Sequence, residues 1–360
     1  MYVILEKKLK KVMALFLLIS LFSCCLTSCA SYAENKLEFF DETTMKIKDM
    51  GVIFSAQAIV TENGNCYIRY RDLDEDYPLG FEKSKYYRTY AKYSDISNNN
   101  RFFELYSGGD AKKVFLSGNS VIIITDENKL LLFYSTEKYL DPEVFAEGVV
   151  EAKFVEKENR IYVVEEGGSF GYYFVEDNKT FVSIMENVIS FERVGNIFAI
   201  HTKDNELIIT DNSFTAEQLS HRLEDIIDYS LSQGTGANGM VVSYVTSDAR
   251  CFYRQGFISM LQDFRDVEAY DQVAESVIQV AAFKKGMLYL DDDYNARIYG
   301  EDILSSDQFY QGALVAENVE NIFANVSEMF ILYKDGSYIF IGSAPDRTYV
   351  TISDILIDET

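Results

Sequence analysis

A short pattern recurs along most of the chain and restricts the possible folds more than any other feature. Each copy contains two apolar residues with two residues between them, then a β-rich run, a polar turn and a second β-rich run. In the clearest copy, Val319-x-x-Ile322 precedes the run from Met329 to Tyr333, the turn Lys334-Asp335-Gly336 and a second run that ends at Gly342. The copies centre on Met50, Val114, Phe154, Phe191, Tyr229, Val280 and Ile322, with spacings of 64, 40, 37, 38, 51 and 42 residues.

These repeats predict an all-β fold. Polar turns between β-branched or aromatic runs are typical of hairpins. A hairpin unit of about 40 residues cannot bury both of its faces alone, so the copies must pack on one another. Packing around an axis protects the sheet edges and gives a seven-bladed β-propeller. The end segments Leu37–Phe40 and Tyr349–Leu356 both have the composition of short strands. We expect each to share a blade with strands from the opposite end of the chain and so close the ring, unless they are tails.

The form "apolar-x-x-apolar … K-D-G-x-x-x-x-x-G" resembles the repeat of the regulator of chromosome condensation family, over residues 45–343. That resemblance implies a seven-bladed propeller. The family's usual Trp-Gly at the end of the second strand is replaced here by Ile341-Gly342 and Tyr299-Gly300. The family's nucleotide exchange on a nuclear GTPase does not fit an exported protein, so only the fold is carried over.

The N-terminus has the organisation of a secretion signal. Lys7, Lys8, Lys10 and Lys11 precede an apolar run from Val12 to Phe22, which is too short to cross a bilayer comfortably. The following Leu26-Thr27-Ser28-Cys29 resembles a lipobox, the processing motif of bacterial lipoproteins. The resemblance implies cleavage before Cys29 and lipidation (diacylglyceryl and fatty acyl groups such as palmitate) of that residue. An ordinary signal peptide or an uncleaved N-terminus is the alternative.

The resulting organisation is a signal peptide over 1–28, a short tether over 29–36 and a single propeller domain over 37–360. Two acyl chains hold a protein firmly on a bilayer. We therefore expect the protein to be lipid-anchored and extracytoplasmic, on the cell membrane or the outer membrane.

Charge and composition exclude several classes of partner and of functional site. Removal of residues 1–28 takes away four lysines and one glutamate, which changes the formal net charge from −24 to −27. Such a charge repels phosphate backbones and anionic headgroups, so nucleic acid is not expected as a partner. The chain has two histidines and no tryptophan, which disfavours zinc enzymes, His-based triads and Trp-lined sugar platforms. Cys66 and Cys251 follow the turns of non-adjacent repeats, so two separate thiols are expected despite export.

Residues 81–101 form the candidate recognition surface. This stretch lies in the longest interval between repeats, and Tyr and Arg are common in contact surfaces. The alternative is an ordinary outer strand whose aromatic rings pack on a neighbouring blade. The predicted partner-binding residues are Tyr86, Tyr87, Arg88, Tyr90, Lys92 and Tyr93.

Three other motifs have simpler explanations. Gly234-x-Gly236-x-x-Gly239 matches a dinucleotide fingerprint, but a strand-like run follows it, which favours a hairpin loop. Asp291, Asp293 and Asn295 resemble the start of a calcium loop, yet they also fall where the repeat requires a hairpin turn. Thr215-x-x-Gln218 is typical of a helix N-terminus, here a short helix between two blades. No metal site and no cofactor are assigned.

The sequence thus predicts a non-enzymatic, membrane-anchored propeller scaffold that binds a surface protein or a polymer such as a glycan. The enzyme alternative is a carboxylate-dependent hydrolase of extracellular glycans, which requires two carboxylates about 5–10 Å apart in a pocket. A structural module of an envelope assembly is the third possibility.

Overall fold

The computed structural model describes residues 45–53, 56–70, 102–117, 120–134, 144–175, 180–236, 238–301, 308–326, 328–343, 349–350, 355 and 357. These residues belong to one compact unit, Phe39–Thr360. No helix among them is long and apolar enough to cross a membrane.

Seven small antiparallel sheets, here called blades 1–7, follow one another along the chain. Each of them is a meander of consecutive strands, as the hairpin repeats predict. Blade 1 contains β1 (Ile47–Ile53), β2 (Ala56–Thr61), β3 (Cys66–Tyr70) and β4 (Phe103–Tyr106). Blade 2 contains β5 (Ala111–Ser117), β6 (Ser120–Thr125), β7 (Leu130–Tyr134) and β8 (Val144–Ala146). Blade 3 contains β9 (Val149–Val155), β10 (Arg160–Glu165), β11 (Phe170–Phe174) and β12 (Phe181–Met185).

The other four blades follow the same order. Blade 4 contains β13 (Val188–Val194), β14 (Ile197–Thr202) and β15 (Leu207–Asp211). Blade 5 contains β16 (Ile226–Gln233), β17 (Gly239–Thr246), β18 (Cys251–Phe257) and β19 (Asp271–Ala274). Blade 6 contains β20 (Val277–Phe283), β21 (Gly286–Asp291), β22 (Ala296–Glu301) and β23 (Phe309–Ala316). Blade 7 contains β24 (Val319–Ala324), β25 (Met329–Tyr333), β26 (Tyr338–Ser343) and β27 (Tyr349–Val350).

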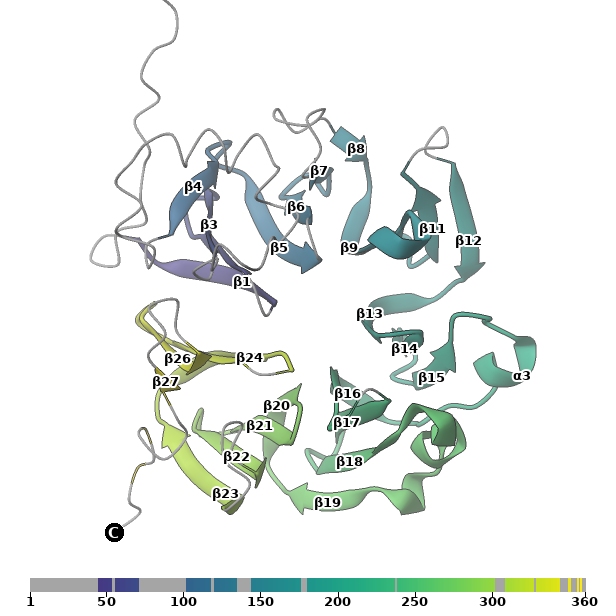
Figure 1. Ribbon diagram of the computed structural model, residues 1–360, viewed down its shortest axis with the longest axis vertical. Helices are drawn as coiled ribbons and strands as arrows, with labels where there is room; N and C mark the ends of the chain where they lie inside the picture. The colour runs from purple at the N-terminus through teal and green to yellow at the C-terminus, as the bar shows by residue number, and fades with distance from the viewer. Residues whose placement is uncertain are drawn as a thin grey trace, which may run out of the picture. The chain divides into compact units, whose positions relative to one another are not determined.

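The blades stand around a common axis with the first strand of each innermost (Figure 1). Seven hydrophobic clusters fill the seven junctions between adjacent blades, one cluster to each junction. At the first junction, for example, Val60 of blade 1 packs with Val114 of blade 2. No blade buries both of its faces alone, so the ring is the unit of stability. The predicted seven-bladed β-propeller is confirmed.

The polar turns of the repeat connect neighbouring blades as well as neighbouring strands. In each turn between the second and third strands, one residue has a left-handed backbone, as Gly64 (φ 75°) and Asn205 (φ 59°) illustrate. In blades 1–6 its carbonyl accepts a hydrogen bond from the first residue of the next innermost strand, for example Ala111 N to Gly64 O at 2.9 Å. These contacts place all of the turns on one side of the ring, which we call the turn face. The opposite side, where the first and second strands connect, is the loop face.

Blade 4 replaces its fourth strand with a short helix. Helix α3 (Ala216–Leu219) begins at Thr215, whose side chain accepts a hydrogen bond from the backbone of Gln218, so the helix predicted between two blades is confirmed. The Gln218 side chain donates to Asp211 at the end of β15 (2.7 Å) and so fixes the helix against the blade. Asp211 also accepts hydrogen bonds from the backbone and hydroxyl of Ser213. In blade 5, the 3₁₀ segments η4 (Ile258–Arg265) and η5 (Val267–Ala269) connect β18 to β19.

The ring closes through side-chain packing in the part of the chain that the structure describes. Ile47 and Met50 of blade 1 share a hydrophobic cluster with Phe330 and Leu332 of blade 7. The strand expected within Tyr349–Leu356 forms as β27, but it pairs with β26 of its own repeat and not with the opposite end. Its position follows from chain continuity, since β26 is the free edge nearest to it. Leu37–Phe40 lies outside the described residues.

The structure decides two further sequence predictions. Cys66 and Cys251 are both buried free thiols, as predicted. The third repeat, however, is displaced by two residues from the expected anchor. The bulge of β9 precedes Glu151, which makes Ala152 and not Phe154 the equivalent of Met50. Val149-x-x-Ala152 has the same apolar spacing as the other repeats.

Candidate functional site

A ring of mostly polar and charged residues surrounds the axis of the propeller. Each innermost strand has a β-bulge near its start, and the residue immediately after the bulge occupies an equivalent position in all seven blades. These seven equivalent positions are partly accessible to solvent. They are Asp49, Lys113, Glu151, Ser190, Asp228, Gln279 and Asn321.

Several of these residues form hydrogen bonds to the backbone of the following blade. Asp49 Oδ2 accepts from Val114 N at 2.8 Å, and Asp228 Oδ2 accepts from Val280 N at 2.7 Å. Gln279 Oε1 accepts from the equivalent amide of the last blade at 3.2 Å. The acceptor side chain therefore satisfies an inner backbone N–H that has no strand partner on that side.

Side chains two residues further along the innermost strands, and one side chain on a second strand, also form hydrogen bonds to the backbone of the following blade. Glu192 of blade 4 accepts a hydrogen bond from the backbone N–H of Leu231. Lys153 of blade 3 donates to the carbonyl of Arg193 at 2.8 Å. His201, on the second strand of blade 4, donates through Nε2 to the carbonyl of Ile226 at 2.9 Å. We call these side-chain-to-backbone contacts the inter-blade clasps.

Enclosure by protein shifts the protonation of the inner carboxyls. Burial raises the pKa of Asp49 to about 6. It raises the pKa values of Glu151, Glu192 and Asp228 to about 7, and neighbouring carboxylates add to the increase for Glu151 and Glu192. The ring and the neighbouring Glu192 therefore provide carboxyl groups that exchange protons close to neutral pH.

Shifted carboxyl pKa values are common at catalytic sites, but here geometry gives them a structural use. Asp49, Glu192 and Asp228 each bind an amide of the adjacent blade, which fixes their oxygens in the wall. No group of His, Cys, Asp or Glu in the described ranges is arranged to hold a metal ion. The inner ring thus stabilises the contacts between adjacent blades.

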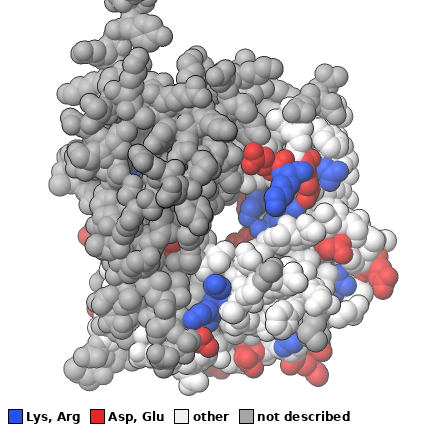
Figure 2. All heavy atoms as spheres, viewed as in Figure 1, with Lys and Arg blue, Asp and Glu red and all other residues white. Residues whose placement is uncertain are grey.

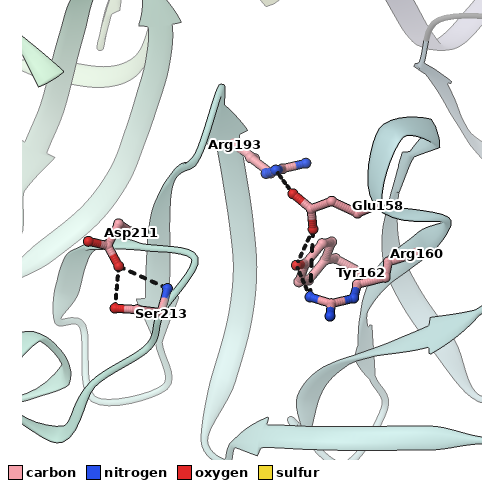
Figure 3. Close-up of polar contacts among 6 residues, drawn as sticks. All are labelled: Glu158, Arg160, Tyr162, Arg193, Asp211 and Ser213. Atoms are coloured by element: carbon pink, nitrogen blue, oxygen red, sulfur yellow. Dashed lines mark hydrogen bonds and ion pairs between the residues drawn. The ribbon is translucent and has the colours of Figure 1, made fainter.

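A cluster of arginine and aromatic side chains occupies the loop face beside the axis, between blades 3 and 4 (Figure 3). Glu158, in the short 3₁₀ turn η3 (Glu156–Glu158), forms an ion pair with Arg193 from the end of β13. Its other oxygen accepts a hydrogen bond from the hydroxyl of Tyr162 at 2.8 Å. Arg160 lies 3.7 Å from the same carboxylate.

Aromatic rings hold both guanidinium groups in place. Arg193 lies over the rings of Tyr162 (5.5 Å) and Phe198 (5.1 Å). Arg160 lies over the rings of Tyr172 (4.3 Å) and Phe174 (5.3 Å). Such cation–π contacts fix a guanidinium without using its hydrogen-bond donors.

The cluster presents positive charge on a strongly acidic protein. Arg160 has 30% of its side chain exposed, although its Nε is buried. Figure 2 shows basic atoms with adjoining acidic ones gathered near the centre of this face. We call Glu158, Arg160, Arg193 and their aromatic neighbours the loop-face cluster. It is a rigid group of Arg and Tyr side chains, which are the residue types that contribute most to binding surfaces.

Only some of the residues singled out from the sequence belong to the described part of the chain. Cys29 and the predicted partner-binding residues Tyr86, Tyr87, Arg88, Tyr90, Lys92 and Tyr93 lie outside the described residues. Asp291, Asp293 and Asn295 form the hairpin turn between β21 and β22. The Asp291 carboxylate pairs with Arg297 (3.2 Å) and accepts from Asn295 N (2.8 Å), so its oxygens already have donors. Gly234 and Gly236 lie between β16 and β17, and Gly239 begins β17, as expected for a hairpin connection.

Sequence reasoning missed both the inner ring and the loop-face cluster. A signal for the ring exists, because the residue before each apolar anchor is polar in every repeat, from Asp49 to Asn321. The loop-face cluster has no such signal. Glu158 and Arg193 are 35 residues apart and meet only because adjacent blades bring their inner strands together.

Comparisons with known proteins support the fold alone. No family model matches the chain, and no curated protein matches it. Among solved structures, a chain of the mitotic checkpoint complex is similar over 85% of this chain and 90% of its own length, with a TM-score of 0.54 and 10% identity. The computationally designed protein Ika8 matches at a TM-score of 0.45 and 9% identity, over 85% of both chains. Human WBSCR16 matches at 0.40 and 11% identity, over 83% of this chain and 77% of its own. At such identities the similarity establishes a propeller and no function.

Proposed function

We propose that the protein is a lipid-anchored, extracytoplasmic scaffold that binds a surface protein or polymer through the loop face of its propeller. The observation that carries the proposal is the loop-face cluster. It combines a partly exposed, ring-stacked Arg160 with an ion pair between the buried Arg193 and the partly buried Glu158, on a closed ring of blades. A preorganised Arg and aromatic group loses little conformational entropy on binding.

Residues 81–101, the candidate stretch from the sequence, lie outside the described residues, so they support the proposal only through their Tyr and Arg content. The hydrolase alternative is less well supported, because three inner carboxylates are held by inter-blade clasps.

The anchor can be tested separately from binding. Replacement of Cys29 with alanine is expected to release the protein from the membrane fraction into the soluble extracytoplasmic fraction, because no acyl chain can then be attached. Cys24→Ala is the matched control, since Leu21-Phe22-Ser23-Cys24 has a bulky residue where the lipobox requires a small one. Immunoblots of fractionated cells give the readout. Retention of the Cys29 variant on membranes, or release of the Cys24 variant, contradicts the assignment.

Binding at the loop face is tested by photo-crosslinking on intact cells. A photoreactive residue in place of the exposed Lys157 is expected to give a discrete adduct, and Arg160→Ala in the same chain is expected to reduce its yield at least about fivefold, equivalent to roughly 1 kcal/mol. A photoreactive residue in place of Glu127, which is exposed in the turn between β6 and β7 on the turn face, is the positional control. Identical adducts from both positions, or a yield that Arg160→Ala leaves unchanged, would refute the proposal.

A further inference from the structure

The bulge residue of each innermost strand marks a second ring of equivalent positions, at the mouth of the propeller on the turn face. The bulge places one unpaired residue between two residues that pair with the second strand. In blade 4, for example, Val188 and Ser190 pair with β14 while Ile189 is left out. The seven bulge residues are Lys48, Lys112, Val150, Ile189, Ile227, Ile278 and Glu320.

Three of these positions in consecutive blades expose an isoleucine. Ile189, Ile227 and Ile278 are 44%, 43% and 38% exposed. Nothing in the fold requires this, because Lys48 and Glu320 occupy the same position in other blades. Single exposed apolar residues are ordinary, whereas three at one equivalent position of adjacent blades make a continuous feature. We call these three isoleucines the apolar crescent.

Acidic side chains border the apolar crescent. They come from the residues just before the innermost strands and from the polar turns of blades 4–6, all on the turn face. The exposed ones are Glu186, Asp204, Glu224, Asp225, Asp248, Glu275, Asp292 and Asp293.

Two exposed bases lie in the same segments. Arg250 pairs with Asp248 at 2.7 Å, so that pair adds no net charge, whereas Lys203 donates to the carbonyl of Gly167 at 2.7 Å and keeps its charge. The eight border carboxylates outnumber these two bases, so the border of the crescent carries net negative charge around an apolar centre.

We propose that the apolar crescent is a docking site for a basic amphipathic protein segment, with apolar residues on one side and Lys or Arg around them. Complementary charge selects such a segment, since an acidic or neutral apolar partner gains nothing from the acidic border. The apolar side chains cover Ile189, Ile227 and Ile278, and the basic ones contact the border carboxylates. As in the proposed function, the propeller is a scaffold that binds another molecule. It uses the opposite face of the ring, so each can fail without the other.

The test uses the purified full-length protein in a non-ionic detergent and a synthetic amphipathic helical peptide of leucine and lysine. Fluorescence anisotropy of the labelled peptide is expected to show saturable binding that weakens as salt is raised. The triple variant Ile189→Ser, Ile227→Ser and Ile278→Ser is expected to weaken binding at least about tenfold, which corresponds to about 1.4 kcal/mol. Phe257→Ser is the matched control, because Phe257 is 55% exposed at the loop-face end of β18.

Two further peptides separate the contributions to binding. A leucine–glutamate peptide of the same pattern is expected not to bind, and a scrambled leucine–lysine peptide is expected to bind at least about tenfold more weakly. Equal binding of the scrambled peptide, or equal affinity for the triple isoleucine variant, overturns the proposal in favour of general charge attraction. Sedimentation of the wild-type protein as a dimer that the triple variant loses also overturns it, because a second copy is then the occupant. Thermal melting of each variant verifies that the ring is intact.

Discussion

Asp228→Ala is expected to lower the free energy of unfolding by about 3 kcal/mol, the largest effect of any single inter-blade clasp. The carboxylate of Asp228 accepts a hydrogen bond from Val280 N at 2.7 Å, across the junction of blades 5 and 6. Alanine removes a charged hydrogen bond and leaves an enclosed backbone N–H without a partner. It also leaves a small void beside the contact between β16 and β20.

Asp228→Asn is the matched control, because the amide keeps an oxygen that can accept from Val280 N. At pH 8 this variant is expected to be as stable as the wild-type protein or more so, since it no longer holds an enclosed negative charge. Urea unfolding followed by tyrosine fluorescence gives the midpoint and slope for both variants. Equal losses for alanine and asparagine would show that the hydrogen bond is not what stabilises this junction.

The architecture could be predicted because the same local rules act seven times. The turns Glu62-Asn63-Gly64 and Lys334-Asp335-Gly336 contain residues that adopt a left-handed backbone at little cost. Even Ala249 and Tyr294 adopt this conformation in their turns, since the hydrogen bond from the following blade requires it. Repetition made the pattern visible although two of the copies have unfavourable residues at the key position.

Other features of the ring depend on contacts that a linear pattern does not contain. The repeat pattern predicts an anchor at Phe154, but the position of the bulge depends on pairing with β10 and selects Ala152. The pairing of β27 with β26 depends on which edge lies nearest to the end of the chain. A periodic pattern identifies the strands, whereas the register and the edges are set in three dimensions.

The candidate surfaces differ in how far the sequence could have revealed them. The inner acids and the apolar crescent both occupy fixed positions relative to the apolar anchors, so an alignment of the repeats would have found them. The Arg193–Glu158 pair joins two different repeats at positions that are not equivalent. Only the ring brings them together, and no repeat pattern predicts that contact.

Stability is expected to fall as the pH rises from about 5 to about 8. The folded pKa of Asp49 is about 6 and those of Glu151, Glu192 and Asp228 are about 7, whereas the ordinary values are 3.8 for Asp and 4.5 for Glu. Between these limits the folded protein binds more protons than the unfolded chain, so the free energy of unfolding decreases with pH. The loss is complete once the pH exceeds the folded values. Burial lowers the pKa of His201, so this one group makes the free energy of unfolding increase with pH and partly offsets the decrease from the four carboxyls.

The expected decrease between pH 5 and pH 8 is at least about 3 kcal/mol. A one-unit shift of one group corresponds to about 1.4 kcal/mol, and partial exposure of the ring positions to solvent reduces the sum over the four carboxyls. Urea midpoints measured across this range give the slope. This protein is expected to become more stable as its carboxyls are protonated, whereas proteins with paired carboxylates usually become less stable.

General repulsion within a chain of net charge −24 also lowers stability as the pH rises. The contribution of the inner carboxyls must therefore be measured separately from this repulsion. The double variant Glu192→Gln and Asp228→Asn removes two of the shifted groups and is expected to reduce the slope by about half. The control, Asp204→Asn with Asp293→Asn, removes the same charge from exposed turns and is expected to leave the slope nearly unchanged. If both pairs reduce the slope equally, the pH dependence arises from total charge. If only the inner pair does, the carboxyls that fasten the blades are also the groups through which pH controls the stability of the ring.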